Sequence, residues 1–346
     1  MKIALVGRVA EGKELFDGQT VKTRYLYELL KQIDDVVLVD TYEYKKHIVS
    51  MLFSSIKALS KSDAVVLSIS INGRRFFFPF FYYLNKIYKK NIYHSLIGGR
   101  LASNIEKNPS WKKYVNSFKI NWVESHELVS LLNNMGVMNA QYLPNFKKLE
   151  KAELLETYSF SEPYRYCMFS RVQKQKGITD AIDTIFAINS QYGCKKATLD
   201  IYGPIDEDFK TEFFELLDKH SDYIVYKGSV DAAKSVETLQ SYYMLLFPTR
   251  YFNEGIPGTI IDAMAAGVPV IARKWHYCSE MLTHQINGLV YDFDDIDGLF
   301  EMIKYSIENE DLVVRMKPKC LEKADEYLFE TAFKMIKAAL NKGTMI

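Results

Sequence analysis

The sequence has little of what marks several classes of protein. Its 44 basic and 43 acidic residues leave a net charge of +1, so charge gives no reason to expect a nucleic acid as partner. It has four cysteines, at positions 167, 194, 278 and 320, and no two of them form a C-x-x-C pair. We therefore expect neither a disulfide framework nor a metal site.

Long apolar runs are also missing. No stretch of about 18 or more apolar residues occurs, so no transmembrane helix is predicted. The first residues, MKIALVGRVAEG, become polar directly after a short apolar run, which indicates a strand and not a signal peptide. The resulting expectation is a cytoplasmic protein.

The chain does contain a repeated alternation of apolar strands and amphipathic helices. Strands are predicted at Lys2 to Gly7, Val36 to Asp40 and Ala64 to Ile69, and the same plan begins again at Arg165. Strands that are apolar throughout indicate parallel sheets covered by helices on both faces. We expect an α/β chain with one domain over residues 1–146 and a second over 147–324. A final helix, over about 325–346, is expected to return to the first domain.

The stretch from Leu245 to Val270 reads LLFPTRYFNEGIPGTIIDAMAAGVPV and predicts a strand, a loop, a helix and another strand. That order places Glu254 on a loop at the carboxyl edge of a parallel sheet, where open α/β sheets bind ligands. The helix is predicted from Thr259 to Ala266, directly after Gly258. A helix N-terminus preceded by glycine suits a phosphate.

These acidic residues also have simpler interpretations. Thr259-x-x-Asp262 has the spacing of a capping box, in which Asp262 would hold the N-cap amide. Glu254 would then be a solvated acid on an exposed loop. Two basic residues that follow the strand at 165–170, Arg171 and Lys176, would in isolation also be ordinary surface.

The run E-G-I-P-G-T-I-I-D-A-M-A-A-G-V-P-V-I nevertheless resembles the acid-x7-acid motif of glycosyltransferase family 4. These are retaining, nucleotide-sugar-dependent enzymes of the GT-B fold, in which two Rossmann-like domains face each other across a cleft. The chain departs from the family pattern at Asp262, where glutamate is usual, and at Pro257, where glycine is usual. Proline lacks a backbone N–H, so one phosphate donor is missing and Gly258 is expected to replace it.

The resemblance implies a role for each matching position. Glu254 would contact the donor sugar, while Arg171 and Lys176, which resemble the family's Arg…Lys-Gly pair, would neutralise the diphosphate without a metal. The predicted substrate-binding residues of the second domain are Tyr226 and Gly228 for the base, Gly258 for phosphate, Asp262 for ribose, and Thr259 next to Gly258.

The same resemblance implies two further groups of substrate-binding residues in the first domain. Gly18, Gln19 and Thr20 begin a helix and are expected near the donor phosphates; the alternative is a plain N-cap at Asp17 or Thr20. Gly98, Gly99 and Arg100 follow a strand and are expected to contact acceptor or donor. His94 lies inside that strand and is interpreted as structural.

An aromatic stretch in the first domain, from Phe76 to Phe81, consists of phenylalanine apart from Pro79 and has basic residues on both sides. It is too short to span a bilayer. Two hypotheses remain open for it. One is a surface that rests on the inner face of the membrane or holds a lipid-linked acceptor. The other is a helix buried against the sheet.

Taken together, the resemblance implies transfer of a sugar from a nucleotide-diphosphate sugar, most simply a UDP-sugar, with retention of configuration. The acceptor would be a hydroxyl of a saccharide or lipid-linked saccharide in capsule, exopolysaccharide or O-antigen synthesis. The nucleotide sugar is a substrate, so no cofactor is expected. Two rival hypotheses are a nucleotide-sugar epimerase of the same fold and a non-catalytic nucleotide-sugar-binding subunit.

Overall fold

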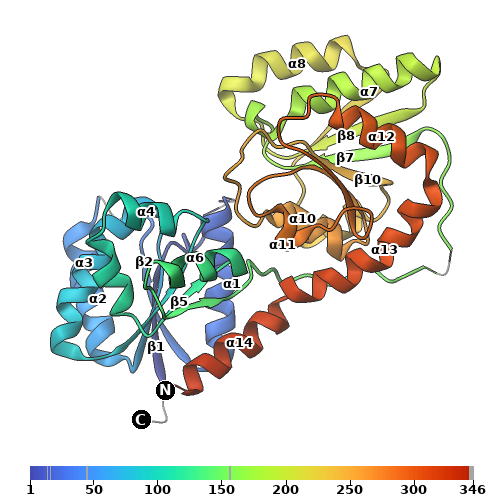
Figure 1. Ribbon diagram of the computed structural model, residues 1–346. Coiled ribbons are helices and arrows are strands. Elements are labelled where there is room, and N and C mark those ends of the chain that lie inside the picture. The colour runs from blue at the N-terminus through green and yellow to red at the C-terminus, as the bar shows by residue number, and fades with distance from the viewer. Residues whose placement is uncertain (14, 16, 44–45, 156, 343–346) are drawn as a thin grey trace. The chain divides into compact units, whose positions relative to one another are not determined.

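Figure 1 shows a computed structural model of the protein, which describes residues 1–13, 15, 17–43, 46–155 and 157–342. The chain divides into two compact units. Unit 1 comprises Met1–Lys148 together with the chain from Tyr327 onward, and unit 2 comprises Leu149–Glu326. The two boundaries predicted from the sequence are at residue 146 and near residue 325.

Unit 1 is built on a parallel six-stranded sheet with the order β2-β1-β3-β4-β5-β6. The strands are β1 (Lys2–Gly7), β2 (Asp35–Asp40), β3 (Ala64–Ser68), β4 (Asn91–Ser95), β5 (Ile120–Val123) and β6 (Ala140–Tyr142). The helices are α1 (Gly18–Ile33), α2 (Ile48–Lys61), α3 (Ile71–Tyr88), α4 (Leu101–Lys107), α5 (Trp111–Asn116), α6 (His126–Asn134) and α14 (Phe329–Lys342). The last helix, α14, packs against α1 and buries Ile336 and Leu340 in the core of unit 1.

Unit 2 repeats this plan with the order β12-β11-β10-β7-β8-β9, again parallel throughout. Its strands are β7 (Tyr164–Phe169), β8 (Ala197–Tyr202), β9 (Ile224–Gly228), β10 (Met244–Phe247), β11 (Val270–Arg273) and β12 (Gly288–Tyr291). Its helices are α7 (Ile178–Tyr192), α8 (Lys210–Lys219), α9 (Ser235–Leu239), α10 (Gly258–Ala265), α11 (Cys278–Met281), α12 (Gly298–Glu308) and α13 (Glu310–Ala324). Short 3-10 turns are η1 (Lys174–Lys176), η2 (Glu207–Phe209), η3 (Ala232–Lys234) and η4 (Asp325–Tyr327).

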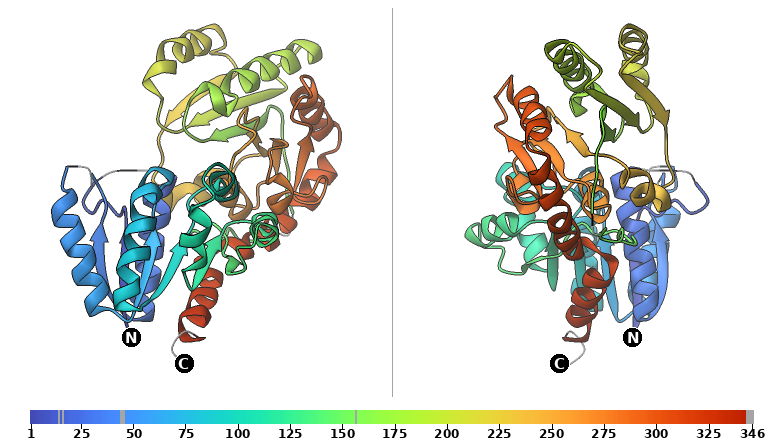
Figure 2. Two further views of the ribbon diagram at one scale, coloured as in Figure 1. Left: turned by 60° about the vertical axis from the view of Figure 1, so that its left-hand side comes forward. Right: turned by 90° about the vertical axis from the view of Figure 1, so that its right-hand side faces the viewer.

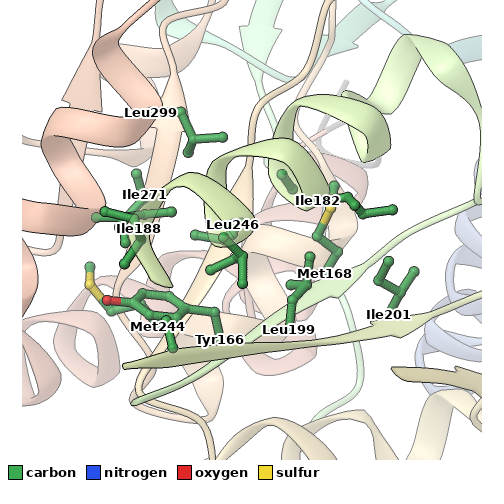
Figure 3. Close-up of a cluster of buried hydrophobic side chains, with 14 of the residues drawn as sticks. Tyr166, Met168, Ile182, Ile188, Leu199, Ile201, Met244, Leu246, Ile271 and Leu299 are labelled. Carbon is green, nitrogen blue, oxygen red and sulfur yellow. The ribbon is translucent and has the colours of Figure 1, made fainter. Parts of the chain in front are cut away.

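The core of unit 2 lies between the sheet and its covering helices (Figure 3). Met168, Leu199 and Leu246 come from three strands and meet the apolar face of α7. The predicted buried side of that helix, Ile178, Ala181, Ile182, Ile185 and Ile188, is confirmed. The prediction of an α/β chain with two parallel sheets is confirmed as well.

The aromatic stretch of unit 1 divides between core and surface. Phe77, Phe78 and Phe81 are fully buried in α3, whereas Phe76 and Phe80 are half-buried. The alternative of a helix packed on the sheet is therefore correct for three of the five phenylalanines. No helix of the described residues combines the length and the apolar character needed to cross a membrane.

Two glycines bring the strand-end loops of unit 2 together. Gly203, after β8, has φ +127°, and a Cβ there would lie 1.9 Å from the carbonyl oxygen of Ser170, after β7. A Cβ on Gly177 would lie 2.1 Å from the carbonyl oxygen of Pro248, after β10. Backbone contact this close excludes any side chain, so the shape of this sheet edge depends on glycine at both positions.

We expect Gly203→Ala to destabilise unit 2 by about 3 kcal/mol or more, because the methyl group adds a backbone clash to an unfavourable φ. Gly193→Ala is the matched control, since Gly193 also has a positive φ, +64°, but has open space around it. That variant should lose about 1 kcal/mol. Urea unfolding of both variants measures the difference, and equal losses would show that the close contact is unimportant.

Unit 2 also contains a buried lysine, Lys317. The Lys317 ammonium on α13 is 1% exposed, lies 5.1 Å and 5.3 Å from the rings of Tyr158 and Phe160, and donates to the carbonyl of Gly267 at 3.3 Å. Burial lowers the pKa of Lys317 from 10.5 to about 8. Between these two values the unfolded chain keeps a proton that the folded protein has lost, so stability rises with pH.

We therefore expect the wild type to gain about 3 kcal/mol relative to Lys317→Met as the pH rises from 8 to 10.5. Below pH 8 both folded and unfolded wild type carry the charge, and the difference between the two proteins should be constant. Urea unfolding of both proteins across this range provides the measurement. A difference independent of pH would contradict the burial argument.

Candidate functional site

The site in unit 2 is built from two loops that leave the same edge of the sheet. β7 and β10 are neighbouring parallel strands, so the segment after β7 and the segment after β10 leave side by side. The amide of Arg250 donates to the carbonyl of Gln175 at 2.9 Å, which joins the two loops through their backbones. Together with the close approach at Gly177, this bond fixes the position of η1 relative to the loop that carries Glu254.

Lys176 and Glu254 meet where these loops touch. The Lys176 Nζ lies 2.6 Å from Glu254 Oε2, and the two side chains are 18% and 17% exposed. The Thr249 hydroxyl lies 3.4 Å from the same carboxylate oxygen. The ring of Phe247 lies 5.7 Å below the ammonium. A cation and an acid predicted from separate motifs, 78 residues apart, are thus in direct contact.

Arg171 points to a different partner. Its guanidinium lies 3.7 Å from Asp206 Oδ1, and both side chains are substantially exposed. Asp206 is the residue before η2 in the segment that follows β8, so Arg171 joins the ends of β7 and β8. The two predicted catalytic cations therefore lie at the same sheet edge but are paired with different carboxylates.

The loop that carries Glu254 is held by a residue that the sequence patterns did not predict. Trp275, two residues after the end of β11, is 1% exposed, and its indole Nε1 donates to the carbonyl of Gly255 at 3.0 Å. The amide of His276 donates to the carbonyl of Phe252 at 2.9 Å. These two hydrogen bonds hold the loop after β10 on both sides of Glu254. The signal in the sequence was a tryptophan two residues past a strand end, at the same edge as the acidic loop.

A second unpredicted brace involves Asp180 in the first turn of α7. Its carboxylate accepts from Arg250 Nε at 3.1 Å and from Arg273 at 3.1 Å, and it forms a further ion pair with Arg250. Asp180 lies four residues after Lys176, Arg250 lies four before Glu254, and Arg273 ends β11. One carboxylate therefore joins three strand-end segments of the site.

Helix α10 starts differently from the prediction. It begins at Gly258 with Pro257 as N-cap, so the alternative interpretation of Thr259 and Asp262 as a capping box is wrong. Asp262 is 2% exposed, and Ser235 Oγ of α9 donates to its Oδ1 at 2.9 Å. The hydroxyl of Thr259 is buried and has no hydrogen-bond partner among the described residues. Asp262 thus joins α9 to α10, and its predicted contact with a ribose stays a prediction.

Tyr226 and Gly228, predicted to surround a nucleotide base, lie in β9. The Tyr226 hydroxyl donates to the carbonyl of Gly203 at 2.8 Å, and the Gly203 amide donates to the carbonyl of Gly228 at 2.9 Å. Burial raises the pKa of Tyr226. These contacts give both residues a part in joining β8 to β9, and the base-binding role stays a prediction.

In unit 1 the start of α1 is occupied by a carboxylate of the chain itself. Asp17 is the N-cap and accepts from the amide and the hydroxyl of Thr20 at 3.2 Å and 2.8 Å. Arg8 forms an ion pair with Asp17 and donates to the Thr20 hydroxyl at 2.8 Å. The plain N-cap considered in the sequence analysis is therefore present at Asp17. Gly18 and Gln19 form the rest of the first turn.

Beside this turn lies a pocket of about 360 Å³. It lies at the carboxyl edge of the unit 1 sheet, between the start of α1 and the segments that follow β2 and β3. Its lining combines charged, amide, hydroxyl and aromatic side chains, among them Arg8, Gln19, Glu43, Lys46, Ser70 and Phe77. The volume lies near the lower end of the range for small-molecule sites.

The predicted Gly98-Gly99-Arg100 segment follows β4 and leads into α4, with Gly98 at φ +75°. It is held by Arg74 of α3, which is fully buried and donates to the carbonyl of Ile97 at 2.6 Å. Burial lowers the pKa of Arg74 to about 10. The buried Arg74 therefore anchors the start of this segment, which lies at the same sheet edge as the pocket.

His94 is buried in β4 with its Nδ1 3.1 Å from Asn121 Oδ1, and burial lowers its pKa well below the usual value. Its ring is therefore neutral at pH 7, in agreement with a structural role. A buried ion pair between Lys22 and Glu124, with Lys22 also donating to the carbonyl of Leu96 at 2.7 Å, was not predicted. Among the described residues, no three His, Cys, Asp or Glu side chains gather to hold a metal ion.

Comparison with known proteins gives three kinds of similarity. Residues 163–309 match the protein family described as "Glycosyl transferases group 1". The chain is 25% identical over 154 residues to the amylovoran biosynthesis glycosyltransferase AmsK of Erwinia amylovora, an alignment that covers 43% of this chain and 37% of the relative. It is 22% identical over 200 residues to an N,N'-diacetylbacillosaminyl-diphospho-undecaprenol alpha-1,3-N-acetylgalactosaminyltransferase of Campylobacter jejuni, covering 58% of this chain and 50% of that enzyme.

The chain thus spans half or less of these curated relatives. Among solved structures, Anabaena Alr3699/HepE in complex with UDP superposes with a TM-score of 0.74 at 14% identity, over 99% of this chain and 100% of that one. At this identity the likeness shows the fold. Residues 163–309, which carry Lys176, Glu254 and Asp262, match a glycosyltransferase family, and the two parallel sheets are those of the GT-B fold.

Proposed function

We propose that this protein is a retaining glycosyltransferase that moves a sugar from a UDP-sugar to a hydroxyl of a saccharide or lipid-linked acceptor, in the synthesis of a cell-surface polysaccharide. The observation that carries the proposal is the contact between Lys176 and Glu254 at 2.6 Å. It combines a partly buried cation and a partly buried acid at the ligand-binding edge of a parallel sheet. It also lies inside the segment that matches the glycosyltransferase family.

The cations act on the leaving group in this proposal. Lys176 is paired with Glu254, and Arg171 is paired with Asp206. In the proposal, a diphosphate that enters the site takes the place of these two carboxylates as the partner of both cations. The amide of Gly258 at the start of α10 adds a helix N-terminus, while Pro257 has no N–H to offer. The proposal therefore assigns neutralisation of the diphosphate to side chains and a helix terminus, and not to a metal ion.

The chemical step exchanges one bond at the anomeric carbon for another. The bond from the sugar C1 to the diphosphate oxygen breaks, and a bond from C1 to the acceptor oxygen forms on the same face. The acceptor proton passes to the departing phosphate oxygen, so no side chain is required as general base. Glu254 contacts the donor sugar and stabilises the positive charge that develops at the ring.

The remaining residues of unit 2 bind the nucleotide. The buried Thr259 hydroxyl, which has no partner among the described residues, is available to a phosphate or ribose oxygen. Asp262 reaches the ribose if its bond to Ser235 is shared or exchanged. The end of β9, at Tyr226 and Gly228, takes the base.

The acceptor is assigned to unit 1. Its pocket of about 360 Å³ offers hydrogen-bonding groups and the Phe77 ring, a mixture that suits a sugar. The Gly98-Gly99-Arg100 segment lies at the same sheet edge. The printed name of the Campylobacter relative describes a lipid-linked diphosphate acceptor, which supports testing such acceptors here.

The proposal is tested by product release from UDP-, GDP- and ADP-sugars, with and without an extract of membrane lipids. We expect nucleoside diphosphate from a UDP-sugar, increased by the extract and unaffected by chelator. Epimerised donor without transfer would favour the epimerase hypothesis. Nucleotide binding without any release would favour the non-catalytic subunit.

We expect Glu254→Gln to lower kcat by about a hundredfold or more while UDP binding is retained, because the amide keeps the size of the side chain but removes its charge. Calorimetry with UDP and turnover of the donor measure the two effects separately. Glu215→Gln, an exposed acid on α8, is the matched control and should behave as wild type. Full activity of Glu254→Gln would contradict the assigned role.

We expect Trp275→Phe to lower kcat by about tenfold with a loss of stability near 1 kcal/mol, because it removes the N–H that holds Gly255 but keeps an aromatic ring. The loop that positions Glu254 then loses one of its two anchors. Kinetics and thermal unfolding are compared with Trp111→Phe in α5 of unit 1 as control. Unchanged kcat would show that the indole bond does not position the loop.

A further inference from the structure

Helices α2 and α3 of unit 1 contain no acidic residue. They lie side by side on one face of the sheet, while α1 and α14 lie together on the other (Figure 1; left view of Figure 2). Their exposed charges are all basic: Lys57 and Lys61 on α2, and Arg75 and Lys86 on α3, with Lys89 directly after it. Among the described residues, none of these side chains is paired with a carboxylate.

This face also exposes large apolar side chains. Val49 and Phe53 of α2 are 63% and 70% exposed, and Tyr83 and Ile87 of α3 are 54% and 76% exposed. On α3 the half-buried Phe76 and Phe80 continue the row, because positions 76, 80, 83 and 87 follow the spacing of one helix face. The exposed apolar residues are therefore gathered on two neighbouring helices.

The positive charges are interleaved with aromatic rings. The Lys86 ammonium lies 4.9 Å and 5.4 Å from the ring centres of Tyr82 and Tyr83. On α5, which packs against α3, the Lys113 ammonium lies 5.0 Å from the ring of Tyr114. Tyrosine and lysine in this arrangement suit the boundary between water and lipid headgroups, where the ring is half-immersed and the amine reaches phosphate.

We propose that this face, defined by the outer sides of α2 and α3, docks on the surface of an anionic lipid bilayer. Charge complementarity favours an anionic lipid surface as the partner, because the face has five exposed cations and neither helix has an acidic residue. The face also exposes large apolar side chains to water, which is typical of an interaction surface. Amphipathic helices with this composition lie in the headgroup region with their apolar residues inserted. The surface shares only the half-buried Phe76 and Phe80 with the predicted Phe76–Phe81 stretch, because Phe77, Phe78 and Phe81 are in the core.

The inference does not depend on transferase activity, so its test requires no turnover. Full-length protein is sedimented with vesicles of phosphatidylcholine alone and of phosphatidylcholine mixed with phosphatidylglycerol. We expect binding to the mixed vesicles, weak binding to the neutral ones, and a steep loss with added salt. The predicted loss of affinity is about fivefold for each basic residue removed from the face.

Two sets of variants separate the contributions of apolar and charged side chains. Val49→Ser/Phe53→Ser/Ile87→Ser removes apolar side chains from the face, and Phe214→Ser/Ile296→Ser removes exposed apolar side chains from unit 2 as control. Lys57→Gln/Arg75→Gln/Lys86→Gln and the control Lys195→Gln/Lys219→Gln/Lys234→Gln both lower the net charge from +1 to −2. We expect each variant of the face to lose vesicle binding and each control to retain it.

Three results would overturn the proposal. Equal binding to neutral and anionic vesicles would show that the basic residues do not drive binding. Equal losses of binding in the face variants and their controls would show that the face of α2 and α3 is not the binding surface. Concentration-dependent dimerisation that the Val49/Phe53/Ile87 variant abolishes, without vesicle binding by the wild type, would assign the face to a second copy of the chain. Circular dichroism of every variant before the assay ensures that lost binding reflects the surface and not unfolding.

Discussion

The contact between the loops after β7 and β10 is the constraint on which the site of unit 2 depends. Two parallel strands that are neighbours in a sheet release their loops at the same edge, but they do not by themselves bring side chains to 2.6 Å. That distance requires Gly177, because any side chain there would collide with the carbonyl of Pro248. The backbone bond from Arg250 to Gln175 then fixes the alignment of the two loops.

The parts of the site that could be predicted from sequence are those whose position follows from the residues next to them in the chain. Glu254 and Lys176 each follow an apolar strand and precede a helix, so their place at the sheet edge follows from strand, loop and helix signals alone. Trp275 and Asp180 could not be predicted in this way. Asp180 accepts hydrogen bonds from side chains 70 and 93 residues away, and the sequence near Asp180 does not indicate partners at that separation.

Two differences between sequence and structure have the same physical origin. The spacing of Thr259 and Asp262 satisfies a local capping rule, yet the Asp262 carboxylate bonds to Ser235 on another helix. The aromatic stretch of α3 is uniformly apolar in sequence, yet helical geometry buries Phe77, Phe78 and Phe81 and leaves Phe76 and Phe80 half-buried. In both cases the tertiary neighbour decides which of several locally permitted contacts is made.

The pairing of Lys176 with Glu254 and of Arg171 with Asp206 also bears on how a transferase of this kind would choose its ligand. A single negative charge that displaced one carboxylate would gain little, because it would only replace one ion pair by another and leave the acid unpaired. A diphosphate carries enough charge and enough oxygens to engage both cations at once and to accept from the start of α10. In the proposed reaction, the Glu254 carboxylate released from Lys176 would lie beside the sugar, and the positive charge that develops on the sugar ring would replace the charge of Lys176.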